Sequence, residues 1–181
     1  MEAIADLLKI MIPALIVMGT AYFLIARQQE QFKQFLDTKT ANKLAELKAE
    51  SNKTTLPLRL QAYERVILYL ERISPNNMIM RVYKPGMSSK LLQAELARTI
   101  REEYEHNMTQ QVYVSHNCWL LLKNAKEETI RMINVAAAGI PGDASGLELS
   151  AAVFEIGQKI DKMPTDIAIN FAKNEVQKLF S

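Results

Sequence analysis

The clearest hydrophobic pattern in the chain is one uncharged run near its start. It begins at Ile10, reads IMIPALIVMGTAYFLIA and ends at Ala26, directly before Arg27. Extended back to Leu7, the run covers about 20 residues, which as an α-helix cross the roughly 30 Å hydrocarbon layer of a membrane. Helices of soluble domains rarely lack a polar face over this length. The pattern therefore predicts a transmembrane helix over residues 10–26, preceded by a short tail of residues 1–9.

A cleaved signal peptide is the main alternative explanation of this run. Glu2 and Asp6 stand where a signal peptide carries net positive charge. The run is also longer than a signal-peptide core, and no good small-x-small cleavage site accompanies it. These features favour a retained membrane anchor over a processed leader.

Residues 27–55 form a polar neck without Gly or Pro, which predicts a second helical segment. Its apolar residues are spaced roughly as a helical stripe, at Phe32, Phe35, Leu36, Leu44 and Leu47. Lysines and Thr40 interrupt any heptad pattern, so a solvated stalk is favoured over a coiled coil. A neck that lies on the membrane surface or pairs with a second copy stays open. The polar stretch 51–55, SNKTT, predicts a linker into a folded domain.

Residues 56–181 repeat apolar positions at three- and four-residue spacing, which predicts a small bundle of about five helices and no sheet. The whole chain is thus expected to be all-α. The first bundle helix is expected to be capped by Thr55, with Pro57 in its first turn. Its apolar face is formed by Leu60, Tyr63, Ile67, Leu70 and Ile73. Residues 74–77, SPNN, predict a turn, and residues 78–87 an irregular connection.

The remaining bundle helices have capping signals of their own. Ser88 or Ser89 starts the second, with the apolar positions Leu92, Leu96, Ile100 and Tyr104. A short extended piece over residues 111–114 precedes Ser115, which caps the third, with the apolar positions Trp119, Leu122, Ala125, Thr129, Ile133 and Ala137. A left-handed cap is expected at Gly139. A capping box of Ser145 and Glu148 opens the fourth, through Ile160, and Thr165 caps the fifth, with Ile167, Phe171 and Val176 inward.

Charge changes the picture by giving the predicted span an orientation. The chain has a formal net charge of +2, but the excess is concentrated in residues 27–59, which carry seven Lys or Arg against four acidic residues. By the positive-inside rule, the C-terminal part is expected in the cytoplasm and the N-terminus outside. Arg27 and Lys33 are expected to meet anionic lipid headgroups. The balanced charge beyond residue 59 argues against nucleic acid as a partner. The single Cys118 gives no intramolecular disulfide.

Two pairs of residues are candidates for metal-binding or catalytic groups. Glu103 and His106 form one Glu-x-x-His, but a di-iron site needs a second copy and further carboxylates. His116 and Cys118 are two positions apart on a predicted helix and so point in different directions. One Cys and two His cannot complete a zinc site. The sequence therefore predicts no metal, no cofactor and no catalytic group, with these four residues as weak metal candidates.

The adaptable side chains of the connection after the first bundle helix suggest a partner contact. Methionine is frequent at surfaces that bind several partners. The residues concerned are Met78, Met80, Tyr83 and Met87. Coverage of the bundle by the same side chains is the simpler alternative.

Three sequence stretches carry a resemblance to a known family. They are LPLRLQAYER at residues 56–65, SPNN at residues 74–77, and QVYVS at residues 111–115 ahead of Trp119. They resemble an uncharacterised family of short membrane-anchored proteins from Bacteroidota. The resemblance covers most of the chain and implies a bacterial inner-membrane setting, but it brings no functional residue with it.

The sequence leads to the hypothesis of a single-pass inner-membrane protein whose cytoplasmic helical domain is a non-catalytic interaction or scaffold module. Two alternatives stay open. One is an enzyme with an unfamiliar site that draws on Glu102 and on the four weak metal candidates. The other is self-assembly through the span and neck, with Gly19 as a point of close helix approach.

Overall fold

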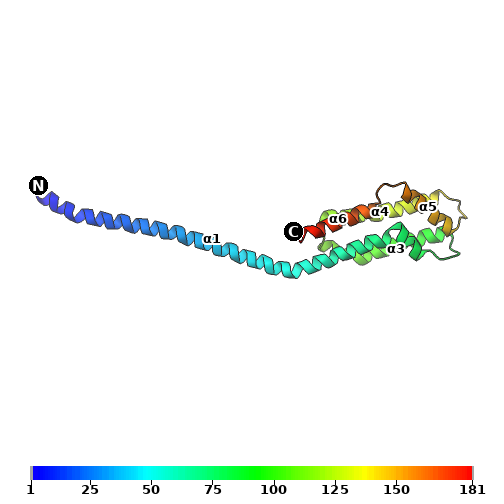
Figure 1. Cartoon of the computed structure of the whole chain (residues 1–181), viewed down its shortest axis with the longest axis horizontal. Coiled ribbons are helices and arrows are strands. Elements are labelled where there is room, and N and C mark those ends of the chain that lie inside the picture. The colour runs from blue at the N-terminus through cyan, green and yellow to red at the C-terminus, as the bar shows by residue number, and fades with distance from the viewer. Residues whose placement is uncertain (1, 181) are drawn as a thin grey trace. The chain divides into compact units, whose positions relative to one another are not determined.

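The computed structural model describes the backbone of residues 2–180, together with the side chains of Met11 and residues 15–180. The described chain is all-α, as predicted, and contains no β-strand. Its helices are α1 (Glu2–Ile73), α2 (Pro75–Val82), α3 (Ser89–Asn107), α4 (His116–Ala138), α5 (Gly146–Gln158) and α6 (Pro164–Lys178) (Figure 1). A 3-10 helix, η1 (Met108–Val112), connects α3 to α4.

The chain divides into two compact units, Met1–Thr54 and Thr55–Ser181. Helix α1 is continuous through residues 51–55 and through Pro57, where the sequence predicted a linker and a new helix start. The linker and the Thr55 cap are therefore replaced by helix. The neighbouring Leu, Lys, Ala and Glu are strong helix formers, and at the exposed Pro57 water can replace the backbone hydrogen bond that proline cannot donate.

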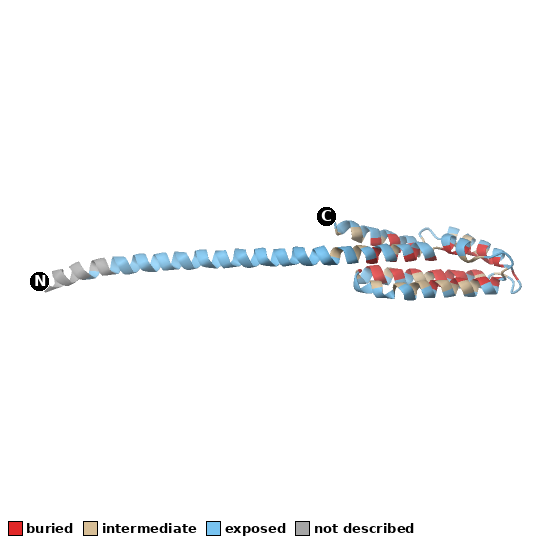
Figure 2. Ribbon diagram, turned by 90° about the horizontal axis from the view of Figure 1, so that it is seen from below, coloured by how far each residue is buried: buried red, intermediate tan, exposed pale blue. Residues whose placement is uncertain are grey.

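In the first unit, every described side chain is exposed (Figure 2). Within the described residues, we find no helix that combines the length and the apolar character needed to cross a membrane. The predicted span over residues 10–26 includes Ile10 and Ile12 to Ala14, whose side chains lie outside the described residues. The transmembrane helix therefore stays a prediction.

The second unit is a helical bundle with one apolar core. Helix α4 packs against α3, α5 and α6, while α2 packs against α3 and α5. Helices α1 to α5 contribute the largest fully buried apolar side chains, which include Leu70, Met78, Leu92, Leu96, Leu122, Ile133 and Leu149. Ala168, Ile169 and Ala172 add the contribution of α6.

Serine caps position three of the bundle helices as the sequence predicted. The side chains of Ser88, Ser115 and Ser145 each accept a hydrogen bond from a backbone N–H three residues later. The reciprocal bond from the backbone N–H of Ser145 to the Glu148 carboxylate completes the capping box, at 2.8 Å. Each cap satisfies one of the backbone donors that a helix start leaves without a partner. The predicted starts of α3, α4 and α5 are confirmed.

The loops before α3 and α5 are bonded to each other. Ser88 and Ser145 form an isolated antiparallel β-bridge. The N–H of Ser89 donates to the carbonyl of Ala144 at 2.9 Å, and the N–H of Gly146 donates to the carbonyl of Met87 at 2.7 Å. A Cβ at Gly146 would lie 3.0 Å from that carbonyl oxygen, so glycine permits this close approach.

Several predicted segments differ in the structure. Residues 75–82 form α2 instead of a turn and an irregular connection, because Pro75 in the first helical turn is a favourable start. Residues 108–112 form η1, so the extended piece predicted at residues 111–114 is wrong. Gly139 has φ −85°, which excludes the left-handed cap. Helix α5 ends at Gln158, two residues before the predicted end.

The start of α6 was predicted wrongly, and its core face was predicted only in part, because Phe171 and Val176 are partly buried against the core as expected. The helix cap is Met163, followed by Pro164 in the first turn, and Thr165 lies inside the helix, fully buried. The buried face contains Thr165, Ala168, Ile169 and Ala172. Ile167, predicted to point inward, is 45% exposed. Three of the four buried side chains are small, and α6 packs against α4.

Candidate functional site

A polar cleft of the second unit lies between α1 and α3. It has a volume of about 650 Å³. Helix α1 contributes Arg65, Tyr69 and Arg72 to its walls, and α3 contributes Glu102, Glu103 and His106. Two of the four weak metal candidates, Glu103 and His106, therefore share one cleft.

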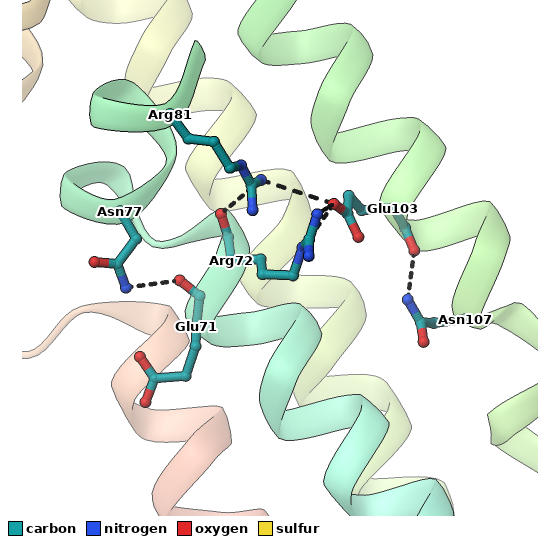
Figure 3. A network of polar contacts seen from close by, with 6 residues as sticks. All are labelled: Glu71, Arg72, Asn77, Arg81, Glu103 and Asn107. Carbon is teal, nitrogen blue, oxygen red and sulfur yellow. Dashed lines mark hydrogen bonds and ion pairs between the residues drawn. The ribbon is translucent and has the colours of Figure 1, made fainter.

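Glu103 is the centre of an ion-pair network in this cleft (Figure 3). Arg72 holds the Glu103 Oε1 atom through its Nε at 2.7 Å and its Nη2 at 2.5 Å. Arg81 of α2 lies 3.7 Å from the same oxygen. Two cations thus converge on one carboxylate oxygen that is only partly exposed. Such charge-assisted contacts hold a carboxylate as an ion-pair acceptor and fix α1, α2 and α3 relative to one another.

Helix α2 also supplies hydrogen-bond donors to the last backbone carbonyls of α1. Arg81 Nη2 donates a hydrogen bond to the carbonyl of Arg72 at 3.3 Å, and Asn77 Nδ2 donates to the carbonyl of Glu71 at 3.0 Å (Figure 3). The last carbonyls of a helix have no partner within the helix, so these side chains supply it. The network therefore has a structural role, in which both arginines help to hold α1, α2 and α3 together.

Tyr69 forms the buried side of the cleft. Its side chain is 1% exposed, and its ring packs edge-on against Tyr104 with 6.3 Å between ring centroids. Burial, and then the nearby Tyr104 and Glu103, raise the pKa of the Tyr69 hydroxyl far above its ordinary value. The hydroxyl has no hydrogen-bond partner among the described residues. Burial of a hydroxyl group without a hydrogen-bond partner lowers the stability of the folded state. Removal of the Tyr69 hydroxyl is therefore a direct test of this arrangement.

His106, His116 and Cys118 do not come together as ligands. His106 and His116 are exposed, while Cys118 is buried in the core. Burial, with a smaller effect of Glu175, raises the pKa of the Cys118 thiol to about 12. Within the described part of the chain, no group of three or more His, Cys, Asp or Glu side chains is placed to hold a metal ion. A thiol with this pKa is protonated near neutral pH and is a poor nucleophile.

The four residues considered for partner contact have different surroundings. Met78 is fully buried in the core, whereas Met80 on the same helix is 83% exposed. Tyr83 and Met87 are partly buried against the core. Of the four, Met80 is the one that is mostly exposed, because α2 turns one side inward and the other outward. The role of these residues in partner binding stays a prediction.

A second polar cluster joins α1, α4 and α6, and sequence reasoning missed it. The Tyr63 hydroxyl donates to Glu175 Oε2 at 2.8 Å, and the Ser115 hydroxyl donates to the same oxygen at 2.8 Å. The backbone N–H of Ser115 donates to the Tyr63 hydroxyl at 3.3 Å. Burial, and then the bond to Glu175, raise the pKa of Tyr63. Ser115 was recognisable as a cap, but no sequence signal links it to residues 52 and 60 positions away.

Comparison with known protein families places the chain in a family to which no function is assigned. A family model described as a family of unknown function, DUF7935, matches residues 2–179. The chain belongs to this family. No curated protein and no solved structure matches it. The expectation of an uncharacterised family is confirmed, while the Bacteroidota origin and the membrane anchor lie beyond what membership of DUF7935 says.

Proposed function

We propose that the chain is a single-pass protein of a bacterial inner membrane, and that its second unit is a non-catalytic interaction module on the cytoplasmic side. The observation that carries the proposal is the first unit's exposed apolar surface. From Leu15 to Ala26 all side chains are uncharged and exposed, and Val17, Met18 and Tyr22 are each at least 66% exposed. A helix that is apolar all round is normally covered by lipid or by other protein. Lipid is the cover that best fits an uncharged run of this length.

The charge that follows the run supports the orientation. Arg27 follows Ala26 directly, and Lys33 and Lys39 are exposed on the same helix. Each Lys or Arg near an anionic leaflet is worth about 1 kcal/mol of attraction. The resemblance to membrane-anchored bacterial proteins points to the same setting. Under this proposal, residues 1–9 lie outside, and the second unit lies on the cytoplasmic side.

The chemistry of the second unit supports an interaction module. The cleft carboxylate that sequence reasoning singled out, Glu103, is already held by two arginines, and the Cys118 thiol is buried and protonated. Exposed apolar side chains remain available for contact, among them Met80, Val112 and Leu147. Isolated exposed apolar residues are normal, whereas groups of them mark binding surfaces. The partner is expected to be another protein of the membrane or the cytoplasm.

Topology is tested by labelling single cysteines in intact cells. Cys118→Ala removes the native thiol, and Ala3→Cys and Leu147→Cys then place one thiol on each side of the proposed span. A membrane-impermeant maleimide is expected to label position 3 in intact cells, and position 147 only after permeabilisation. Labelling of position 147 in intact cells would overturn the proposed orientation.

A further inference from the structure

Two hollows flank the solvent-exposed face of α1 in the second unit. The cleft described above lies on the α3 side, and a groove of about 440 Å³ lies on the α6 side. Leu68 is 55% exposed and lines both hollows. The second hollow, which we call the α6-side groove, is lined by the apolar Leu60, Ile67, Leu68 and Val176 together with Tyr63, Glu64 and Glu71. An exposed apolar ridge beside a groove is a shape that can receive a partner.

The charged residues that line the α6-side groove are two glutamates. Glu64 and Glu71 are exposed, and neither carboxylate has an ion-pair or hydrogen-bond partner among the described residues. In Figure 3 the Glu71 carboxylate points away from the ion pairs of Glu103, and only its backbone carbonyl is bonded, to Asn77. The groove therefore combines an apolar floor with two unpaired negative charges.

Neighbouring cations are not paired with these carboxylates. Arg65 and Arg72 of α1 line the cleft on the α3 side, where Arg72 is paired with Glu103. Lys173 lies about one helical turn before Val176 on α6 and does not line the groove. Unpaired carboxylates beside an apolar surface are complementary to the cations of a partner, and such charge pairs fix the register of a complex.

The dimensions of the α6-side groove suit a helix as that partner. From Leu60 to Glu71, α1 rises about 16 Å, or roughly three turns. Glu64 and Glu71 are about two turns apart on one side of α1, as are Leu60 and Ile67. A helix laid along the groove would place an apolar stripe on its floor and one cation opposite each carboxylate.

We propose that the α6-side groove binds an amphipathic helix of a partner protein, one that carries an apolar stripe and two Lys or Arg residues about two turns apart. The inference rests on the proposed role of the second unit as an interaction module, and it names the contact surface of that module. It does not depend on the membrane anchor. Ile67 and Leu68 supply the apolar contact, and Glu64 and Glu71 select a basic partner.

The test uses the full chain in a mild detergent with two fluorescently labelled helical peptides as probes. The basic probe has a leucine stripe and two lysines about two turns apart, and the acidic probe has glutamates in place of these lysines. Fluorescence anisotropy measures binding. The groove variant is Glu64→Lys with Glu71→Lys, and the control variant is Glu105→Lys with Asp143→Lys, which makes the same change in net charge at exposed positions outside the groove. The fluorescence of Trp119 checks that each variant is folded.

The preference between the two probes decides the inference. We expect the natural chain and the control variant to bind the basic probe about tenfold more tightly than the acidic probe, and the groove variant to reverse this preference. No binding of the basic probe by the natural chain, or equal binding of both probes, would overturn the inference. Dimerisation of the natural chain that the groove variant abolishes would also overturn it, because a second copy would then cover the groove.

The control variant separates this inference from the proposed function. If the groove variant keeps the preference for the basic probe and the control variant loses it, the α6-side groove is not the contact surface, but the second unit still acts as an interaction module. The cysteine labelling described above tests the membrane topology independently, so a failure there leaves the result for the groove unchanged.

Discussion

Two tyrosines of α1 offer a matched test of how the bundle is held together. Tyr63 and Tyr69 are both about 1% exposed and lie on the same helix, but their hydroxyl groups differ. The Tyr63 hydroxyl bonds to Glu175 at 2.8 Å, and the Tyr69 hydroxyl has no partner among the described residues. Replacement of each by phenylalanine removes one oxygen atom and leaves the ring in place. The two variants therefore isolate the value of the hydrogen bonds.

The expected effects have different signs. Tyr63→Phe removes a bond to a carboxylate and leaves the N–H of Ser115 without its 3.3 Å partner. Because Glu175 is partly exposed and keeps its bond from Ser115, we expect a loss of about 1–2 kcal/mol in the free energy of unfolding. Tyr69→Phe removes a buried hydroxyl without a partner, so stability is expected to be unchanged or raised by up to about 1 kcal/mol.

Trp119 makes the measurement specific to the second unit. It is the only tryptophan of the chain and is 8% exposed within the bundle. Its fluorescence during thermal unfolding reports the bundle whatever happens to the first unit. For a bundle of this size, about 1 kcal/mol corresponds to roughly 3–5 °C in Tm. Equal destabilisation by both variants, or a larger loss at Tyr69, would refute the assignment of hydrogen bonds made here.

Three further predictions concern helix packing, capping and the buried thiol. Gly146→Ala should lower the free energy of unfolding by about 1–2 kcal/mol, because the new Cβ would lie 3.0 Å from the Met87 carbonyl oxygen. Gly157→Ala, where a Cβ would meet no atom within 4 Å, should raise it by about 0.5–1 kcal/mol. Denaturant titration compares the two variants. Ser115→Ala should cost about 1–2 kcal/mol in the same titration, because the α4 cap and the bond to Glu175 are both lost, and an unchanged midpoint would contradict this. The native Cys118 thiol should react with a maleimide at pH 8 only as fast as the bundle opens. Burial raises the pKa of the Cys118 thiol to about 12 in the folded bundle, compared with about 8.5 in the unfolded chain. The free energy of unfolding is therefore unaffected by this thiol below about pH 8.5 and falls as the pH rises from there toward about 12, because the unfolded chain loses the thiol proton first. Cys118→Ala should reduce this fall.

The sequence predicted the bundle well wherever a local signal fixes the structure. The caps at Ser115 and Ser145 depend on residues three positions apart, and both were recognised. The core faces of α3 and α4 followed from their apolar spacing. Pro75 was read as a turn residue, although its position at the start of α2 is equally compatible with a helix. The choice depends on the burial of Met78 and Ile79 against the rest of the bundle, which no local pattern reveals.

The core face of α6 shows where apolar spacing misleads. Ile167 looks like a core residue but is 45% exposed, whereas the neighbouring small side chain Ala168 and the small Ala172 are buried. Tertiary packing thus selected residues adjacent to the large ones. The polar contacts were beyond reach for the same reason, since Tyr63 meets Glu175 across 112 positions and Arg72 meets Glu103 across 31. Contacts of this kind follow from the assembled bundle and not from spacing along one helix.

The uncharged run beginning at Ile10 is proposed to hold the chain in a membrane, and fractionation of cells tests this proposal directly. After lysis without detergent and an alkaline carbonate wash, the intact full chain is expected in the membrane pellet. A variant with Val17→Lys and Leu24→Lys, which places two charges within the run, is expected in the supernatant with Trp119 still buried. Recovery of the intact full chain in the supernatant, with its first thirty residues present, would contradict both the anchor and the orientation.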